Sequence, residues 1–302
     1  MSSETAPGAT TNGSVIHDIG FRHYEGARLG RGWAFRSLLV ETIRGSFGIG
    51  RPAKVKAMPM VLLGFMTATA IIADAVTILT KADSPSMPYT QFAMNMWLLI
   101  AMFVAGRAPY AVSRDLRDGV LPLYLSRPLK RGDYVWAKLA GVSIATFLFI
   151  AVPLTLLLVG SLLAKLDAAH EIWTWSGSVL MAAVLAVLLS TLSLAVASFT
   201  KRRGFGVAAI MTLVVMAAAF AAIVVNVVNF KVSQAAGAYF SAFDPFALVD
   251  ALGSSWLGVE PVVAERHPVG FLGGFVLTSV LVALVVLGIT VLMRRFKKVG
   301  GV

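Results

Sequence analysis

The residue types that catalyse reactions or hold metals are few in this sequence and lie far apart. Its four histidines show neither an H-E-x-x-H motif nor the carboxylate spacing of a metal site: His17, His23, His170 and His267. Cysteine is absent, which excludes disulfides, thiol catalysis and cysteine-ligated metals. Neither a P-loop, G-x-x-x-x-G-K-[ST], nor a G-x-S-x-G nucleophile elbow occurs. We therefore expect a chain that is not an enzyme and that binds no cofactor of its own.

The chemistry that the sequence does concentrate is ionic, and it lies in residues 113–138, between two long apolar runs. This interval carries six basic residues against three acids, an excess typical of the cytoplasmic side of a membrane. Three leucines lie among these charges: Leu121, Leu123 and Leu125. The pattern predicts a short helix with exposed leucines, held just under a membrane.

Composition places the chain in the membrane class. Hydrophobic residues make up 58% of it and charged residues only 14%, against about 25% charged in an ordinary soluble domain. The formal net charge is +11, but the basic residues cluster beside apolar segments, where they set orientation and meet anionic lipid headgroups. We therefore expect membrane lipid, and no nucleic acid, among the partners.

Six apolar segments are long enough to cross about 30 Å of hydrocarbon at about 1.5 Å per residue. They are residues 58–80, 91–112, 139–164, 176–199, 206–230 and 269–293. If both termini are cytoplasmic, 21 Lys and Arg lie inside and 4 outside, with Arg107 within a span. This asymmetry predicts an all-α, multi-pass protein of the cytoplasmic (inner) membrane with both termini inside.

Two further pieces flank the spans on the inner side. Residues 1–28 are rich in small polar residues and are expected to form a flexible cytoplasmic tail. Residues 29–57 are predicted to hold an amphipathic helix along the inner membrane surface and a linker, with one apolar face made of Phe35, Leu38, Leu39, Ile43 and Phe47. Packing of this helix on a soluble partner is the alternative.

The long outer segment, residues 231–268, is predicted to contain short helices. Asp244 and Pro245 are an N-cap and a first-turn proline, Phe246 begins an apolar face, and Gly253 can end the helix. Aromatic side chains such as Phe243 are costly to leave in water, which favours a helix dipping into the outer leaflet over a solvent loop with one amphipathic turn.

Polar residues inside the predicted spans are few. Asp74 is nearest in depth to Asn95, which could satisfy it, or it could line an outer cavity. Arg107 is expected to reach toward the cytoplasmic headgroups. Because no relay of charged residues runs through the membrane, the sequence favours an energy source outside the spans over proton or sodium coupling.

The charged interval resembles the loop after the second span of ABC-2 type (type-2) ABC-transporter permeases. The positions that carry the resemblance are Arg114, Asp115, Gly119, Leu121, Leu125, Ser126, Pro128, Arg131, Tyr134 and Lys138. Asp115 stands where the family usually has Glu, and Val120 where it has Thr.

The resemblance implies that residues 58–302 form a six-helix permease domain and that residues 113–138 are its coupling loop. Such a subunit is an exporter driven by ATP, which two copies of a separate ABC ATPase bind with Mg and hydrolyse, and it pairs with a second permease copy or a related permease. The few polar groups in the spans favour a hydrophobic or amphipathic substrate. Leu121, Tyr124 and Leu125 would fill a groove on the ATPase.

Other roles follow from the same resemblance. Rim ion pairs to the ATPase would come from Arg114, Asp115, Arg117 and Asp118, and Pro128 with Asp133 as N-cap would restart the third span. The basic turn Lys201, Arg202 and Arg203 is a second candidate contact, or simply anchors the chain by its positive charge. The candidates for a substrate path or outer gate are Asp74 and Asn95, as polar residues within the spans, and Phe243, Pro245 and Phe246, in the segment that caps the path in the resembling family.

Two other functions fit the sequence without the resemblance. An ion-coupled secondary transporter would keep working after ATP depletion and stop when the proton gradient collapses. A noncatalytic membrane scaffold or assembly factor would bind a partner that shows no ATPase activity.

Overall fold

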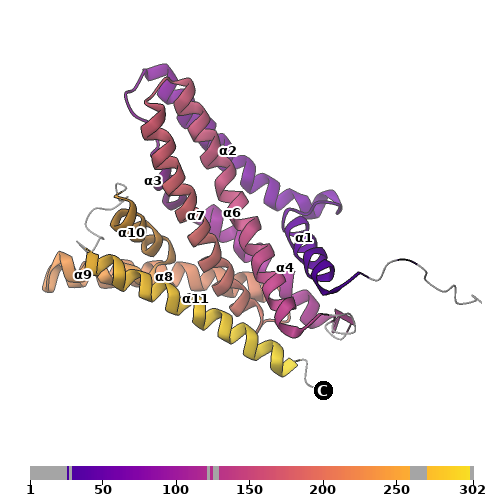
Figure 1. The fold of residues 1–302 in the computed structure, drawn as a ribbon. Helices are drawn as coiled ribbons and strands as arrows, with labels where there is room; N and C mark the ends of the chain where they lie inside the picture. Colours follow the sequence, from indigo (N-terminus) through magenta and orange to yellow (C-terminus); the bar gives the residue numbers. More distant parts are fainter. Residues whose placement is uncertain (1–25, 27–28, 121–122, 125–128, 259–270, 300–302) are drawn as a thin grey trace, which may run out of the picture.

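The computed structural model describes residue 26 and residues 29–120, 123–124, 129–258 and 271–299. The predicted flexible tail therefore lies almost wholly outside the described residues. So do six residues of the predicted coupling loop, among them the predicted site residues Leu121, Leu125, Ser126 and Pro128. Within the described parts of the chain every regular element is a helix (Figure 1).

In the described residues, five helices are long and apolar enough to cross a membrane, and a bent pair counts as a sixth span if its two helices cross together. The five are α2 (Ala53–Thr80), α6 (Arg131–Leu163), α7 (Ala168–Ala197), α8 (Arg203–Lys231) and α11 (Phe271–Val299). The bent pair is α3 (Tyr89–Asn95) and α4 (Trp97–Arg117). This architecture confirms the prediction of an all-α integral membrane protein.

The second span differs from the straight helix predicted for residues 91–112. It breaks at Met96, where the two pieces meet at an angle of 60°. The bend turns α3 toward α6, α7 and the short helix α10 (Pro245–Leu257), and it buries Tyr89 and Phe92. Hydropathy reports only that this segment is apolar, so it could not predict a break that tertiary packing stabilises.

The helix α1 (Arg31–Phe47) matches the predicted amphipathic helix and packs on the protein's own spans. Leu38 and Thr42 are buried, and Thr42 faces Gly141 of α6 so closely that a Cβ there would lie 2.7 Å from its side chain. Gly48, at φ 71°, ends the helix in the left-handed conformation. Trp33 and Val40 remain exposed on other sides of the helix, available to lipid.

Two apolar cores hold the spans together. In the larger one, Phe103 of α4 stacks on Phe149 of α6 with ring centroids 4.2 Å apart. The smaller one surrounds Tyr134 and Val112, where α1, α4, α6, α7, α8 and α11 meet. Many residues of α4 and α6 are buried, so packing holds these two helices in place up to their ends near residues 117 and 131.

The segment predicted to be outer contains α9 (Gln234–Phe240), the 3-10 turn η1 (Ser241–Phe243) and α10. The Asp244 carboxylate accepts the backbone N–H of Phe246 at 3.0 Å, as predicted for an N-cap. Gly253 does not end α10; it lies inside the helix against Met181 of α7, and the helix ends at Gly258, φ 63°. Since α10 buries most of its apolar side chains among α3, α7 and α11, it is inserted between the spans.

Candidate functional site

The connection between α4 and α6 is shorter than the charged interval of residues 113–138, because both helices extend into that interval. Helix α4 continues to Arg117 and ends with Gly119 at φ 63°, where the N–H of Val120 donates to the carbonyl of Asp115. This is a glycine-dependent helix stop, since other residues are strained at that φ.

The α6 helix begins at Arg131, with Lys130 as its N-cap. Asp133, predicted as the N-cap, is the third helical residue: its carboxylate accepts the backbone N–H of Lys130 at 2.9 Å and pairs with Arg31 of α1. One acid therefore fixes the first turn of α6 and also ties α1 to it.

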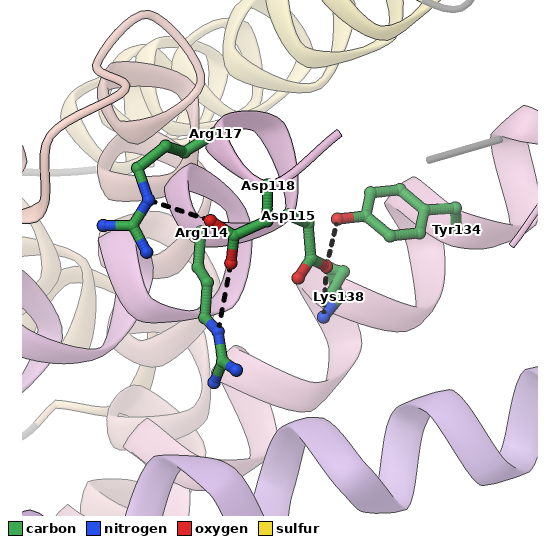
Figure 2. Close-up of polar contacts among 6 residues, drawn as sticks. All are labelled: Arg114, Asp115, Arg117, Asp118, Tyr134 and Lys138. Atoms are coloured by element: carbon green, nitrogen blue, oxygen red, sulfur yellow. Dashed lines mark hydrogen bonds and ion pairs between the residues drawn. The ribbon is translucent and has the colours of Figure 1, made fainter. Parts of the chain in front are cut away.

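Asp115 is engaged inside the protein. Its Oδ2 accepts the Tyr134 hydroxyl at 2.8 Å and lies 3.0 Å from the Lys138 ammonium, and Figure 2 shows these three side chains pointing toward one another. Side-chain exposure is 12% for Asp115 and 8% for Lys138. The prediction of a rim ion pair to an ATPase therefore needs correction, because this carboxylate joins α4 to α6 internally.

Arg114, Arg117 and Asp118 form the exposed counterpart of that buried pair. The Arg117 Nε donates to Asp118 Oδ1 at 2.9 Å, and the Arg114 Nε lies 3.5 Å from Oδ2 of the same carboxylate (Figure 2). The hydrogen bond from Arg117 lowers the pKa of Asp118, with a smaller contribution from Arg114. These side chains present an ionised, solvent-facing cluster at the end of α4.

Leu123 and Tyr124, described residues near the middle of the connection, differ in direction. Leu123 is 69% exposed, whereas Tyr124, predicted to enter a groove on an ATPase, packs on Tyr134 with ring centroids 5.7 Å apart. The Lys138 ammonium lies 6.0 Å from the Tyr124 ring centroid. Leu123 is one of the three leucines that the sequence predicted to be exposed, although it was not among the residues assigned to the ATPase groove.

The basic turn Lys201–Arg203 lies beside the end of α4. The Ser113 hydroxyl donates to the Ala197 carbonyl of α7 at 2.9 Å and is 3.5 Å from the Thr200 hydroxyl. Arg131, at the start of α6, donates to the carbonyl of Lys297 in α11 at 3.3 Å. The structure thus gathers the ends of α4 and α7 and the starts of α6 and α8 on one face, together with the end of α11.

A cavity of about 430 Å³ opens on this face. Its lining alternates basic and acidic side chains around two tyrosines, and it comprises Glu41, Thr42, Arg51, Tyr110, Ala111, Arg114, Asp115, Asp118, Val120, Leu123, Tyr124 and Lys138. No histidine or serine lies in this lining.

Comparison with protein families shows which family the chain belongs to. A family model described as "ABC-2 family transporter protein" matches residues 27–300. The chain belongs to the ABC-2 transporter family. It is therefore a membrane permease subunit of an ABC transporter, and the family implies pairing with an ABC ATPase subunit. A search of curated proteins found no match.

The predicted outer residues of the permease are distributed over several elements. The Asp74 carboxylate lies against Gly160 of α6, where it would overlap an added Cβ, while Asn95 is exposed at the α3–α4 break. Among the described contacts no hydrogen bond joins Asn95 to Asp74, so the predicted pairing is not observed. Asp74 contacts α6 instead.

The aromatic candidates also divide. Phe243 is 53% exposed and packs edge-on against Phe220 of α8, with ring centroids 5.2 Å apart. Pro245 is buried in the first turn of α10, and Phe246 is a core residue whose ring lies 6.4 Å from that of Trp97 in α4. Of these residues, Phe243 alone presents a substantial exposed aromatic surface.

Arg107 does not reach toward the headgroups as predicted. Its side chain is 1% exposed, and the guanidinium Nη2 donates to the Met58 sulfur of α2 at 3.0 Å. The expectation failed because the ends of α2 and α8 cover this part of α4: Gly106 lies against Met58, and Gly206 lies against Pro109.

Proposed function

We propose that this permease exports a hydrophobic or amphipathic substrate with energy from ATP, which two copies of a separate ATPase bind with Mg²⁺ and hydrolyse. It works with a second permease, either another copy or a related chain. The face defined by α4, α6 and the Lys201–Arg203 turn is cytoplasmic in this proposal, and the ATPase docks there.

The observation that carries this proposal is the buried pair directly behind the exposed charges. Asp115 and Asp118 lie three residues apart, one fastened to Lys138 of α6 and the other facing solvent between Arg114 and Arg117. A push on the exposed cluster is therefore transmitted to two spans at once, since the Asp115–Lys138 pair joins α4 to α6. A loosely attached loop would absorb such a push.

The polarity of the spans also supports an outside energy source. Arg107 of α4 contacts Met58 of α2, whereas Asp74 of α2 lies against Gly160 of α6. The two charged groups therefore lie at different helix contacts. Glu171, near the outer start of α7, is 4% exposed and accepts the Tyr89 hydroxyl. These described groups do not form a chain of proton carriers from one face to the other, as ion coupling requires.

The test is capture of the ATPase by tagged permease from its native host, followed by measurement of ATP hydrolysis in the complex. We expect Asp118→Lys and Leu123→Asp each to lower the yield of a Walker-motif ATPase at least tenfold. Asp83→Lys is the matched control, because Asp83 is exposed in the connection between α2 and α3, at the opposite end of α4.

Unchanged ATPase yield in both docking variants would contradict this docking face. Transport that persists after ATP depletion but stops with the proton gradient would select a secondary transporter. A stable partner without ATPase activity would select a scaffold.

A further inference from the structure

Arg107 is a buried cation without an anionic partner among the described residues. Its Nη2 contacts only the Met58 sulfur, a weak acceptor, and its Nε and Nη1 have no hydrogen-bond partner in the described structure. A guanidinium does not lose its proton in proteins, and an unpaired buried charge is strongly unfavourable. The arrangement therefore indicates an acceptor supplied from outside the described chain.

Other groups of the same kind surround Arg107. Tyr110, one turn further along α4, also has a buried hydroxyl without a partner among the described residues. The guanidinium carbons of Arg51 and Arg203 lie 4.9 Å and 5.8 Å from the Tyr110 ring centroid. Arg107 and Arg203 are close enough to repel each other electrostatically. Three arginines from different parts of the chain thus converge on one tyrosine.

The acids nearby do not neutralise this cluster. In the described residues, Asp115 pairs with Lys138, and Asp118 pairs with Arg114 and Arg117. Glu41 lines the same cavity as Arg51 but is exposed, where water screens its charge. The end of the cavity at Tyr110 consequently keeps an excess of positive charge.

There is space for a ligand beside this cluster. The cavity of about 430 Å³ includes Arg51 and the Tyr110 ring in its lining, a size within the usual range for small-molecule sites. Arg107 is not in this lining but lies one turn before Tyr110 on α4, and its Nη2 donates to the Met58 sulfur, on a side chain that changes conformation readily. Movement of Met58 would free Nη2, and an anion could then accept hydrogen bonds from Nη2 together with Nε or with Nη1, the bidentate geometry that arginine offers to phosphate.

We propose that Arg51, Arg107, Tyr110 and Arg203 bind a phosphate group, presented by an anionic phospholipid of the leaflet next to α1. Met58 is five residues into α2, about 8 Å along its axis from the end of that span, a depth near the headgroup boundary. In the most apolar windows of α2 and α8 only 22% and 17% of the residues are buried, so these spans face lipid. The inference does not depend on ATPase docking.

The test measures thermal unfolding of the full-length, delipidated permease in detergent against three probes. These are dioleoyl phosphatidylglycerol, zwitterionic dioleoyl phosphatidylcholine and inorganic phosphate. We expect phosphatidylglycerol to raise the unfolding temperature of the natural protein, and Arg107→Gln to increase the half-saturating concentration roughly ten- to a hundredfold. The control is Arg44→Gln, since Arg44 is an exposed arginine of α1 on the same face; its response should equal that of the natural protein.

Two milder variants keep the test valid if Arg107→Gln does not fold. Tyr110→Phe removes only a hydroxyl, and Arg203→Gln removes an exposed charge; each should weaken the response roughly two- to tenfold. A response to phosphatidylglycerol alone identifies lipid as the source of the phosphate, and an equal response to inorganic phosphate identifies the free anion. Identical half-saturation in the natural protein and in all three site variants would overturn the proposal.

Discussion

Removal of the Asp115 carboxylate is the most informative change to the permease, because it separates internal attachment from docking. Asp115→Ala deletes the partner of Lys138, 3.0 Å away, and the acceptor of the Tyr134 hydroxyl, 2.8 Å away. Both lost contacts join α4 to α6. We therefore expect a less stable protein, and weaker ATPase capture only as a consequence.

The size of the loss in stability depends on the Lys138 ammonium, which stays buried after the Asp115 carboxylate is removed. Breaking a buried ion pair from one side costs about 3–5 kcal/mol, since the other charge stays buried. Lys138 keeps some stabilisation from the Tyr134 ring, whose centroid lies 5.5 Å from the ammonium, worth about 0.5–2 kcal/mol. The lower end, a loss of about 3 kcal/mol in the free energy of unfolding, is expected.

The double change Asp115→Ala with Lys138→Met leaves no buried charge, although the Tyr134 hydroxyl still lacks its acceptor. Its loss should be at least about 2 kcal/mol smaller than the sum of the two single changes. The assay is loss of helical circular dichroism as the SDS fraction rises in mixed micelles. Asp118→Ala, an exposed aspartate on the same helix end, is the control and should leave stability unchanged.

The reasoning would be refuted if Asp115→Ala were as stable as the natural protein but lost the ATPase. That result would make Asp115 a direct contact for the partner. Equal destabilisation by Asp118→Ala would also contradict the division between a buried pair and an exposed one.

Two further predictions concern packing and pH. Gly160→Ala should lower stability by about 1–3 kcal/mol in the same SDS assay, because a Cβ at Gly160 would overlap the Asp74 carboxylate, whereas Gly64→Ala, with no atom within 4 Å of its Cβ position, should be neutral or stabilising. Because the pKa of Asp118 is lowered, its carboxylate stays ionised through the pH range in which an ordinary aspartate titrates, and its ion pairs are lost only as the pH falls through the lowered value. ATPase capture should therefore not vary from about pH 5 to 8. A fall in capture between those values would argue against a role for the Asp118 carboxylate.

Sequence patterns predicted the features of this permease that depend on neighbours along the chain. Six apolar segments, the charged interval between the second and third, and the Asp244–Pro245 helix start are all local: hydropathy is a property of consecutive residues, and an N-cap bonds within its own turn. The resemblance to the family also came from local sequence, because its motif consists of residue types at fixed spacings within residues 113–138.

Tertiary structure decided how the charged groups are used. Asp115 and Asp118 look alike in sequence, yet α6 places Lys138 and Tyr134 beside the first and leaves the second in solvent. Arg107 was expected to reach the headgroups, but α2 encloses it. In both cases the outcome depends on side chains from a distant helix, and sequence spacing does not report which helices meet. A charge is paired, buried or exposed according to those neighbours, because burial and partner distance set its energy.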